Sequence, residues 1–396
     1  MNKSKVALVK CMSYDENEVN LAVKTAIELL GGLDKIMETK ALTKESHFVL
    51  KPNLLAKTSP EKACTTHPAV FKAAGKLMQD GGYSNLTYGD SPGNPVIKPE
   101  KIADECGLKE PADQLGIPFG QFEDGTEVEY PEGRTSKKFV ICDEILASDA
   151  IINVCKMKTH QLERITGAMK NTFGCVYGVN KAASHAKYPT AESFAKMIAD
   201  LNKFITPVLH IMDGITAMEG NGPQSGTPTQ MNVILASQDP VALDTVFCHL
   251  VNLDWKLVPT NVFAMQHGVC TCENIEIITT EGTMTPKQAF QNYGNGTFNV
   301  QRAAEFRGAL NQVKFLKPIL EKKPIVKKER CIGCAICVEA CPVEGKAIKI
   351  INKKATYEYN KCIKCYCCQE MCPKEAITVK KPLLARIADR NWRVYL

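Results

Sequence analysis

The sequence predicts an α/β fold, in which a mainly parallel sheet is flanked by helices, followed by a small α+β domain rich in cysteine. Three observations lead to this prediction. Short β-branched runs alternate with helical periodicity over most of the chain, as in proteins with parallel sheets. The run C-x-x-C-x-x-C-x-x-x-C-P occurs twice in the last quarter. The length of 396 residues exceeds one ordinary core, so two domains are expected.

The strands and helices of the larger domain follow from its apolar pattern. Residues 6–9 predict the first strand, and the helix after it has apolar residues on one face and ends at Gly31 and Gly32. A strand at 48–50 precedes a helix that Thr66 caps, with Pro68 in its first turn. Asp239 with Pro240 begins another helix. Further strands are predicted at 85–88, 139–142, 150–154, 208–212, 232–236 and 275–278.

Polar clusters directly follow four of these predicted strands. They are Lys51-Pro52-Asn53, Gly89-Asp90-Ser91-Pro92-Gly93, Lys156-Met157-Lys158-Thr159-His160 and Asp213-Gly214. In an open α/β sheet, ligands bind outside the carboxyl ends of the strands. The sequence therefore predicts that these clusters form one site.

The residue types at this predicted site suit an anion. Lysines, together with glycines that allow close approach of the backbone, favour a carboxylate or a phosphate. Catalytic roles are predicted for Lys156, Lys158, His160, Lys170 and Asp90. Roles in binding a ligand or cofactor are predicted for Lys51, Asn53, Thr66, His67, Gly89, Ser91, Gly93, Asn171 and Asp213. The candidate proton donors are His67, His160 and His185.

Each of these features alone also has an ordinary structural explanation. A lone histidine is usually structural, a Gly-Asp-Ser-Pro-Gly run makes a plain turn, and a lysine run is usually solvated. It is their combination at one edge of the sheet that favours a functional site.

The same stretches carry a family resemblance. The matching runs are K-P-N at 51–53, T-T-H-P at 65–68, G-D-S-P-G at 89–93, K-M-K-T-H at 156–160, T-G-A-M-K-N at 166–171, M-D-G at 212–214, M-E-G-N-G-P at 218–223 and Q-D-P-V-A at 238–242. Over roughly residues 5–310 the chain resembles the family called domain of unknown function 362. The resemblance implies an α/β fold and association with iron–sulfur clusters, and it implies no particular reaction.

The two cysteine runs are the most specific motif of the chain. Eight thiolates at this spacing suit two [4Fe–4S] clusters, where three close cysteines bind one cluster and the fourth binds the other. The predicted sets are Cys331, Cys334, Cys337 and Cys372, and Cys362, Cys365, Cys368 and Cys341. Zinc would favour two separated C-x-x-C pairs, and a disulfide framework would not need the prolines. Residues 325–380 thus resemble a bacterial two-cluster ferredoxin.

These boundaries define the expected domains. We expect an α/β ligand-binding domain at 1–314, a linker at 315–328, a ferredoxin domain at 329–380 and a C-terminal tail at 381–396. A flavin or another organic cofactor is left open without support from a motif, since the hydroxyl-rich run 279–286 is better explained as a turn.

Composition and charge indicate the environment and the partners. Scattered cysteines beside the cluster motif predict a reducing, cytoplasmic location and an anaerobic source, and no apolar run is long enough to span a bilayer. The net charge is +6, but residues 314–396 contain 19 Lys and Arg against 8 Asp and Glu. This basic segment predicts an acidic redox partner such as a ferredoxin or flavodoxin. No nucleic-acid motif accompanies it.

Four functions are consistent with these features of the sequence. The favoured one is an oxidoreductase that passes single electrons through two [4Fe–4S] clusters to or from a small anionic ligand or cofactor in the α/β crevice. The main alternative is an electron carrier or adaptor with no chemistry of its own. A structural role for the clusters and a non-redox enzyme such as a lyase or racemase are less favoured, because two adjacent clusters suit electron transfer.

Overall fold

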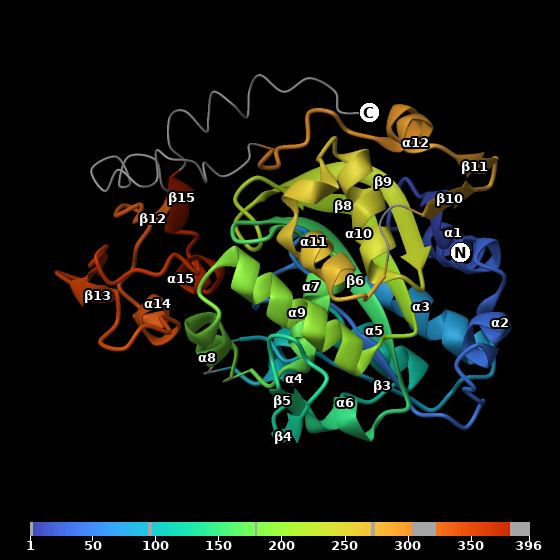
Figure 1. Ribbon diagram of the computed structural model, residues 1–396, viewed down its shortest axis with the longest axis horizontal. Coiled ribbons are helices and arrows are strands. Elements are labelled where there is room, and N and C mark those ends of the chain that lie inside the picture. The colour runs from blue at the N-terminus through green and yellow to red at the C-terminus, as the bar shows by residue number, and fades with distance from the viewer. Residues whose placement is uncertain (1–2, 94–96, 179, 271–273, 303–321, 381–396) are drawn as a thin grey trace.

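The computed structural model describes residues 3–93, 97–178, 180–270, 274–302 and 322–380 (Figure 1). Within these residues, a nine-stranded sheet has the strand order β11-β10-β1-β9-β8-β6-β2-β3, with β7 paired to β6. Its strands are β1 (Ser4–Lys10), β2 (Phe48–Lys51), β3 (Leu86–Tyr88), β6 (Ala150–His160), β7 (Arg164–Thr166), β8 (Leu209–Glu219), β9 (Thr227–Ser237), β10 (Ile275–Thr279) and β11 (Gly282–Met284).

Most strands of this sheet run in one direction. β1 is parallel to β10, and β3, β2, β6 and β8 are parallel to their neighbours in that order. β9 lies between β1 and β8 and is antiparallel to both, so the two parallel groups run the same way. The strands that run against them are β7, β9 and β11. The predicted mainly parallel sheet is therefore confirmed.

Helices cover both faces of the sheet. In β1, Ala7 and Val9 belong to one apolar core and Val6 and Leu8 to another, as the two-residue period of a strand requires. The first core packs against α1 (Glu16–Leu29), α2 (Leu33–Glu38), α3 (Pro68–Asp80), α4 (Pro99–Glu105) and α5 (Lys109–Leu115). The opposite face packs mainly against α9 (Ala191–Ile205), α10 (Pro240–Leu250) and α11 (Pro259–Gln266). The remaining helices of this part are α6 (Asp143–Ala147), α7 (Ala168–Asn171), α8 (Asn180–Lys187) and α12 (Pro286–Tyr293).

Four predicted strands differ from the structure. Those predicted at 208–212 and 232–236 are longer, as β8 and β9, so Asp213-Gly214 lies within β8 and does not follow it. Residues 139–142 lie in β5 (Lys138–Cys142), but β5 pairs with β4 (Gly125–Glu129) in a separate two-stranded sheet. β6 continues past the predicted end at Val154 to His160, because its second half is hydrogen-bonded to β7 on one side and to β8 on the other. The K-M-K-T-H run is thus part of a strand and not of a loop.

The C-terminal module contains two small antiparallel sheets and two short helices. β12 (Lys323–Val326) pairs with β15 (Ile377–Lys380), and β13 (Ile348–Ile351) pairs with β14 (Lys354–Tyr357). The helices are α14 (Ile336–Glu339) and α15 (Cys367–Glu370). Their preceding residues, Ala335 and Tyr366, have φ values of 65° and 66°. The two cysteine loops therefore enter their helices through the same left-handed turn, which matches the sequence repeat.

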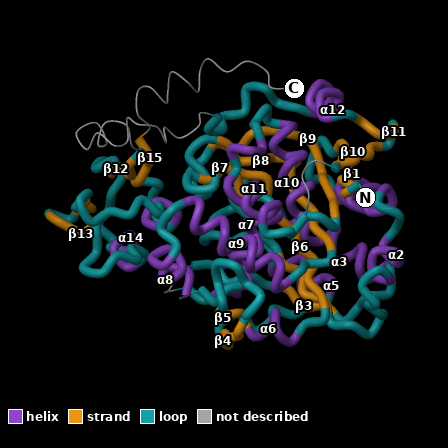
Figure 2. The backbone as a smooth tube through the Cα atoms, in the orientation of Figure 1, coloured by secondary structure: helices purple, strands orange, loops and turns teal. Residues whose placement is uncertain are grey.

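The module lies at one end of the molecule, with α14 and α15 next to α8 (Figures 1 and 2). Its ferredoxin-like α+β character is confirmed. Residues 315–321 of the predicted linker and the predicted tail at 381–396 lie outside the described residues. In the described part of the chain, none of the helices combines the length and the apolar character that crossing a membrane requires.

Candidate functional site

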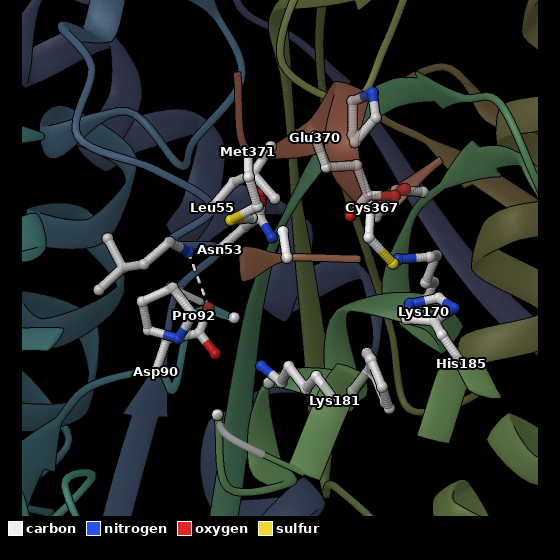
Figure 3. Close-up of a pocket in the computed structure, with 18 of the residues that line it drawn as sticks. Asn53, Leu55, Asp90, Pro92, Lys170, Lys181, His185, Cys367, Glu370 and Met371 are labelled. Carbon is white, nitrogen blue, oxygen red and sulfur yellow. Dashed lines mark hydrogen bonds between the residues drawn. The ribbon is translucent and has the colours of Figure 1, made fainter. Parts of the chain in front are cut away.

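A cavity of about 240 Å³ lies at the carboxyl ends of β2, β3 and β6, between the α/β domain and the C-terminal module (Figure 3). The α/β domain contributes Asn53, Asp90, Lys158, Lys170, Asn171, Lys181 and His185, with the apolar side chains of Leu54, Leu55, Pro92 and Phe173. The module contributes Glu339, Ala340, Cys367, Glu370 and Met371. Both parts of the chain are therefore needed to form the walls.

Three lysines give the cavity its positive charge. Lys158, on β6, is buried and donates to the side-chain oxygen of Asn53 and the carbonyl of Cys64. Lys181, on α8, donates to the carbonyl of Ser91, and Lys170 has only the rings of Phe173 and Phe194 within cation–π distance. No carboxylate of the described residues forms an ion pair with any of the three.

Burial changes the acidity of two of these lysines. It lowers the pKa of Lys158 and that of Lys181 to about 8, because a buried ammonium group loses its hydration. Both groups are still mostly protonated at pH 7. Asp90 raises both pKa values and Glu370 raises that of Lys158, but neither carboxylate forms an ion pair with these lysines, so a bound anion could still pair with them.

Asp90 is already neutralised from behind the cavity. Its Oδ1 lies 3.1 Å from Lys51 Nζ, and its Oδ2 accepts the backbone N–H of Leu54 at 2.8 Å. A Cβ at Gly174 would lie 1.7 Å from Asp90 Oδ1 and 2.5 Å from Lys51 Nζ. Only glycine therefore lets this loop pack on the Lys51–Asp90 pair.

His160 connects the two parts of the chain. Its Nδ1 accepts the backbone N–H groups of Leu162 and Glu163, both at 3.1 Å, so the ring proton resides on Nε2. Nε2 lies 2.8 Å from Oε1 of Glu370, on α15. Burial lowers the pKa of His160 to about 4, so the ring is neutral at pH 7 and its Nε2–H lies next to the carboxylate.

A chain of amides backs the cavity. Asn53 donates to Oδ1 of Asn171 at 2.7 Å, and Asn171 donates to Oδ1 of Asn153 at 2.7 Å. The backbone N–H of Asn53 is bound by Oγ1 of Thr66 at 2.8 Å. These bonds fix Asn53, which in turn orients the ammonium group of Lys158.

Two further polar groups at the cavity have no hydrogen-bond partner among the described residues. They are Oγ1 of Thr166, on β7, and Nδ1 of His185, on α8, and both side chains are 4% exposed. Buried polar atoms are rarely left without a partner, so these positions are available to a ligand.

Part of the predicted site lies elsewhere. Lys156 forms a buried pair with Asp213 at 2.7 Å, and Tyr14 donates to the same carboxylate at 3.0 Å. His67 stacks on Tyr14 with 3.5 Å between ring centroids. This cluster does not line the cavity, since the ammonium group of Lys156 is held by Asp213 and by the hydroxyl of Tyr14. The expectation that all four predicted lysines line one pocket is met only by Lys158 and Lys170.

The remaining predicted residues lie at or behind the walls. Asn53, Asp90, Gly93 and Asn171 line the cavity, and Lys51, Thr66, Ser91 and His160 support residues that do. At Gly89, a Cβ would lie 2.3 Å from the ring of Phe122, which explains the glycine by packing alone.

The eight motif cysteines divide into two groups of four. Cys331, Cys334, Cys337 and Cys372 surround one small space, and Cys341, Cys362, Cys365 and Cys368 surround another. Backbone N–H groups approach the sulfurs of Cys331, Cys341 and Cys372 at 3.3–3.4 Å. In the described residues, no three His, Cys, Asp or Glu side chains converge as a single metal ion requires. The two groups of four thiols fit the ligand sets of polynuclear iron–sulfur clusters.

Comparison with known proteins identifies both parts. The model of the family described as "Domain of unknown function (DUF362)" matches residues 49–249, and that of a 4Fe-4S dicluster domain matches residues 323–373. A thylakoid-associated protein of Synechocystis is 32% identical over 256 residues, which are 64% of this chain and 77% of that protein.

The chain belongs to the DUF362 family.

Among solved structures, a similarity is found to the lactate racemase apoprotein of Thermoanaerobacterium thermosaccharolyticum, with a TM-score of 0.40 and 12% identity. It covers 62% of the DUF362 protein and 57% of the racemase chain. The dicluster match, together with the cysteine geometry, shows that this DUF362 protein binds 4Fe–4S clusters and has an electron-transfer role.

Three residues that line the cavity of this DUF362 protein were not predicted from its sequence, namely Lys181, Cys367 and Glu370. Lys181 follows no strand, and it reaches the cavity because α8 packs beside it. Cys367 and Glu370 belong to the other part of the chain, and only the contact between α15 and the α/β domain brings them to the site. Cys367 is the one residue of the three that the sequence could have indicated, because it is an extra cysteine beside the motif residue Cys368.

Proposed function

We propose that this DUF362 protein is an oxidoreductase that passes single electrons between two [4Fe–4S] clusters and a small anionic ligand in the cavity. One set of cluster ligands is Cys331, Cys334, Cys337 and Cys372, and the other is Cys341, Cys362, Cys365 and Cys368. Bound there, the clusters supply one-electron transfer. The proposal divides the chain at about residue 314 into a ligand-binding domain and the cluster module.

One observation carries the proposal. Helix α15 contains a cluster ligand, Cys368, and also contributes Cys367 and Glu370 to the wall of a cavity with three lysines that lack carboxylate partners. In this proposal, one ligand of a cluster and part of the wall of the anion site therefore lie on the same short helix, α15.

The binding groups of this proposal have distinct tasks. Lys158, Lys170 and Lys181 balance the charge of the ligand, and Thr166 and His185 offer it hydrogen bonds. The apolar side chains of Leu54, Leu55 and Phe173 surround the rest of the ligand and exclude water. The lysines favour a carboxylate or phosphate, and the volume restricts it to a compact molecule.

The alternative, an electron carrier with no chemistry of its own, needs only an exposed cluster. A pure carrier gives no reason for unpartnered buried groups next to the module, and this favours the enzyme. An acidic redox protein, such as a ferredoxin or flavodoxin, is the proposed external partner, because the module is basic.

The test begins with protein purified without oxygen. Two clusters correspond to about eight iron and about eight acid-labile sulfide per chain. Zinc without sulfide would contradict the proposal. Organic analysis of the same sample then identifies any ligand or cofactor that copurifies.

A panel of small mono- and dicarboxylates and inorganic phosphate then tests the cavity. We expect at least one of them to raise the unfolding temperature and to change the EPR spectrum of the reduced protein. Lys181→Gln should weaken this response about tenfold, whereas Lys187→Gln, an exposed lysine on the same helix, should leave it unchanged. An equal response of the two variants, or no response to the whole panel, would favour the carrier.

A further inference from the structure

We infer that the surface around Ile332 and Cys334 is the docking site of a small acidic electron-carrier protein. The cluster site of Cys331, Cys334, Cys337 and Cys372 is then the one that exchanges electrons with this partner. This inference rests on the proposed function and deepens it, since it assigns one cluster site to the partner and the other to the cavity.

The two cysteine groups differ in exposure. Cys334 is exposed, and its neighbour Ile332 is 59% exposed. In the other group, Cys341, Cys365 and Cys368 are buried and Cys362 is only partly exposed. Electron transfer between proteins depends on a short path, so the group with an exposed member is the one that a partner can approach.

The second group lies towards the cavity. Two of its members, Cys341 and Cys368, directly follow the cavity-lining residues Ala340 and Cys367. The other group has one such member, Cys372, which follows Met371. The cluster sites thus have an order, from the outer surface through Cys334 to the cavity through Cys368.

The exposed surface has an apolar centre. Gly333 packs on the backbone of Lys353, where a Cβ would lie 2.6 Å from the carbonyl oxygen, so the first cysteine loop contacts the β13–β14 hairpin. That hairpin exposes Ile351 by 53%. Figure 1 shows β13 at the outer end of the module, away from the α/β domain. Ile332 and Ile351 are two of the few large apolar side chains that the described residues expose.

Positive charge surrounds this centre. Lys328, Arg330, Lys353 and Lys374 are exposed, and Lys374 lines the same small space as Cys331 and Cys334. The nearby carboxylate of Glu375 pairs with Lys62 of the α/β domain at 3.0 Å and lies 3.9 Å from Arg330, and it forms no ion pair with Lys328, Lys353 or Lys374. An apolar centre surrounded by cationic side chains is complementary to the surface of an acidic protein. The positive charge also attracts such a partner before the two proteins touch.

The exchange needs no bond rearrangement. The reduced carrier loses one electron at each encounter and this protein gains it, with no proton or leaving group to place. The carrier itself is therefore the reductant, and the reverse transfer oxidises this protein through the same surface.

The probe is an acidic bacterial flavodoxin, because the absorbance of its flavin can be distinguished from that of the iron–sulfur clusters. Binding of the two oxidised proteins is measured by calorimetry at low salt, and reduction by the flavodoxin hydroquinone by stopped flow. The test variant is Lys328→Glu with Lys374→Glu. The control is Lys24→Glu with Lys76→Glu, two exposed lysines of the α/β domain with the same change in net charge.

We expect the test variant to bind at least tenfold more weakly and to be reduced correspondingly more slowly, with the control within twofold of the wild type. Iron content and cluster absorbance verify that the variants are intact, and Ile332→Ala tests the apolar centre without changing charge. Equal effects of test and control variants, or no measurable binding by the wild type, overturn the inference. Anion binding in the cavity is measured separately, so the docking site and the proposed function fail independently.

Discussion

If the cavity binds an anion as proposed, Lys158 and Lys181 should make its affinity depend on pH. Burial lowers the pKa of each to about 8, so each loses its positive charge as pH rises through this value. We expect affinity for an anion that binds in the panel experiment to be highest near pH 7 and to fall about tenfold by pH 9. Calorimetric titrations at several pH values measure it. Affinity that stays constant to pH 9 would show that these lysines do not contact the anion.

Gly174 is the residue at which the packing of the site is most restrictive. Gly174→Ala would place a methyl group 1.7 Å from Asp90 Oδ1, and either the loop or the Lys51–Asp90 pair would have to move. We expect a loss of about 2–3 kcal/mol in the free energy of unfolding. Denaturant unfolding measures it. Gly296→Ala is the control, since its Cβ would meet only the end of the Phe290 ring, at 3.3 Å.

At the level of the elements, β14 and α15 meet at one cluster site. The hydroxyl of Tyr357, on β14, lies 3.0 Å from Sγ of Cys368. A hydrogen bond to a cluster thiolate stabilises the more negative, reduced form. Tyr357→Phe should therefore lower the reduction potential of one cluster and leave the other unchanged.

EPR-monitored redox titration measures both potentials. Tyr359→Phe is the matched control, because the Tyr359 hydroxyl donates to the carbonyl of Pro324 at 2.9 Å and to no sulfur. A shift of equal size in the control variant would contradict the assignment to Cys368.

The elements also show which parts of the molecule could be predicted from sequence. The apolar periods located β1, β2 and β10 and the apolar parts of β8 and β9, because these segments contribute residues to the apolar cores. The predicted end of β6 was wrong. Its alternating lysines are typical of a loop, and only the pairing with β7 and β8 on its two sides extends the strand to His160. The cysteine sets were predicted because cluster ligation fixes their spacing. Lys181 and Glu370 could not be predicted, because only tertiary contacts bring α8 and α15 to the cavity.

On the scale of the whole molecule, buried histidines make the fold sensitive to acid. Burial lowers the pKa of His160 to about 4, and that of His185 and His210 to about 3. The unfolded chain takes up protons below its histidine pKa of about 6.5, whereas the folded chain does not until pH 4 or lower. The unfolded state therefore binds more protons between these values, and stability falls as pH decreases from 6.5 to 4.

Each fully buried histidine should cost about 2 kcal/mol between pH 6.5 and pH 5. Urea unfolding under anaerobic conditions at both pH values measures the loss, and His210→Gln should reduce it. His210 is the best choice, because it does not line the cavity and burial is the one cause of its shift. A variant with the same pH dependence as the wild type would refute this account.

The cavity wall contributed by α15 also couples two equilibria. A ligand in the cavity contacts both parts of the chain, so it binds only where the module is docked on the α/β domain. By mass action, a ligand at 100 times its Kd favours the docked arrangement by about 2.7 kcal/mol. The proposed ligand would therefore stabilise the contact between the two parts of the chain that its own oxidation or reduction requires. Without it, the proposal implies that the module is held less firmly on the α/β domain.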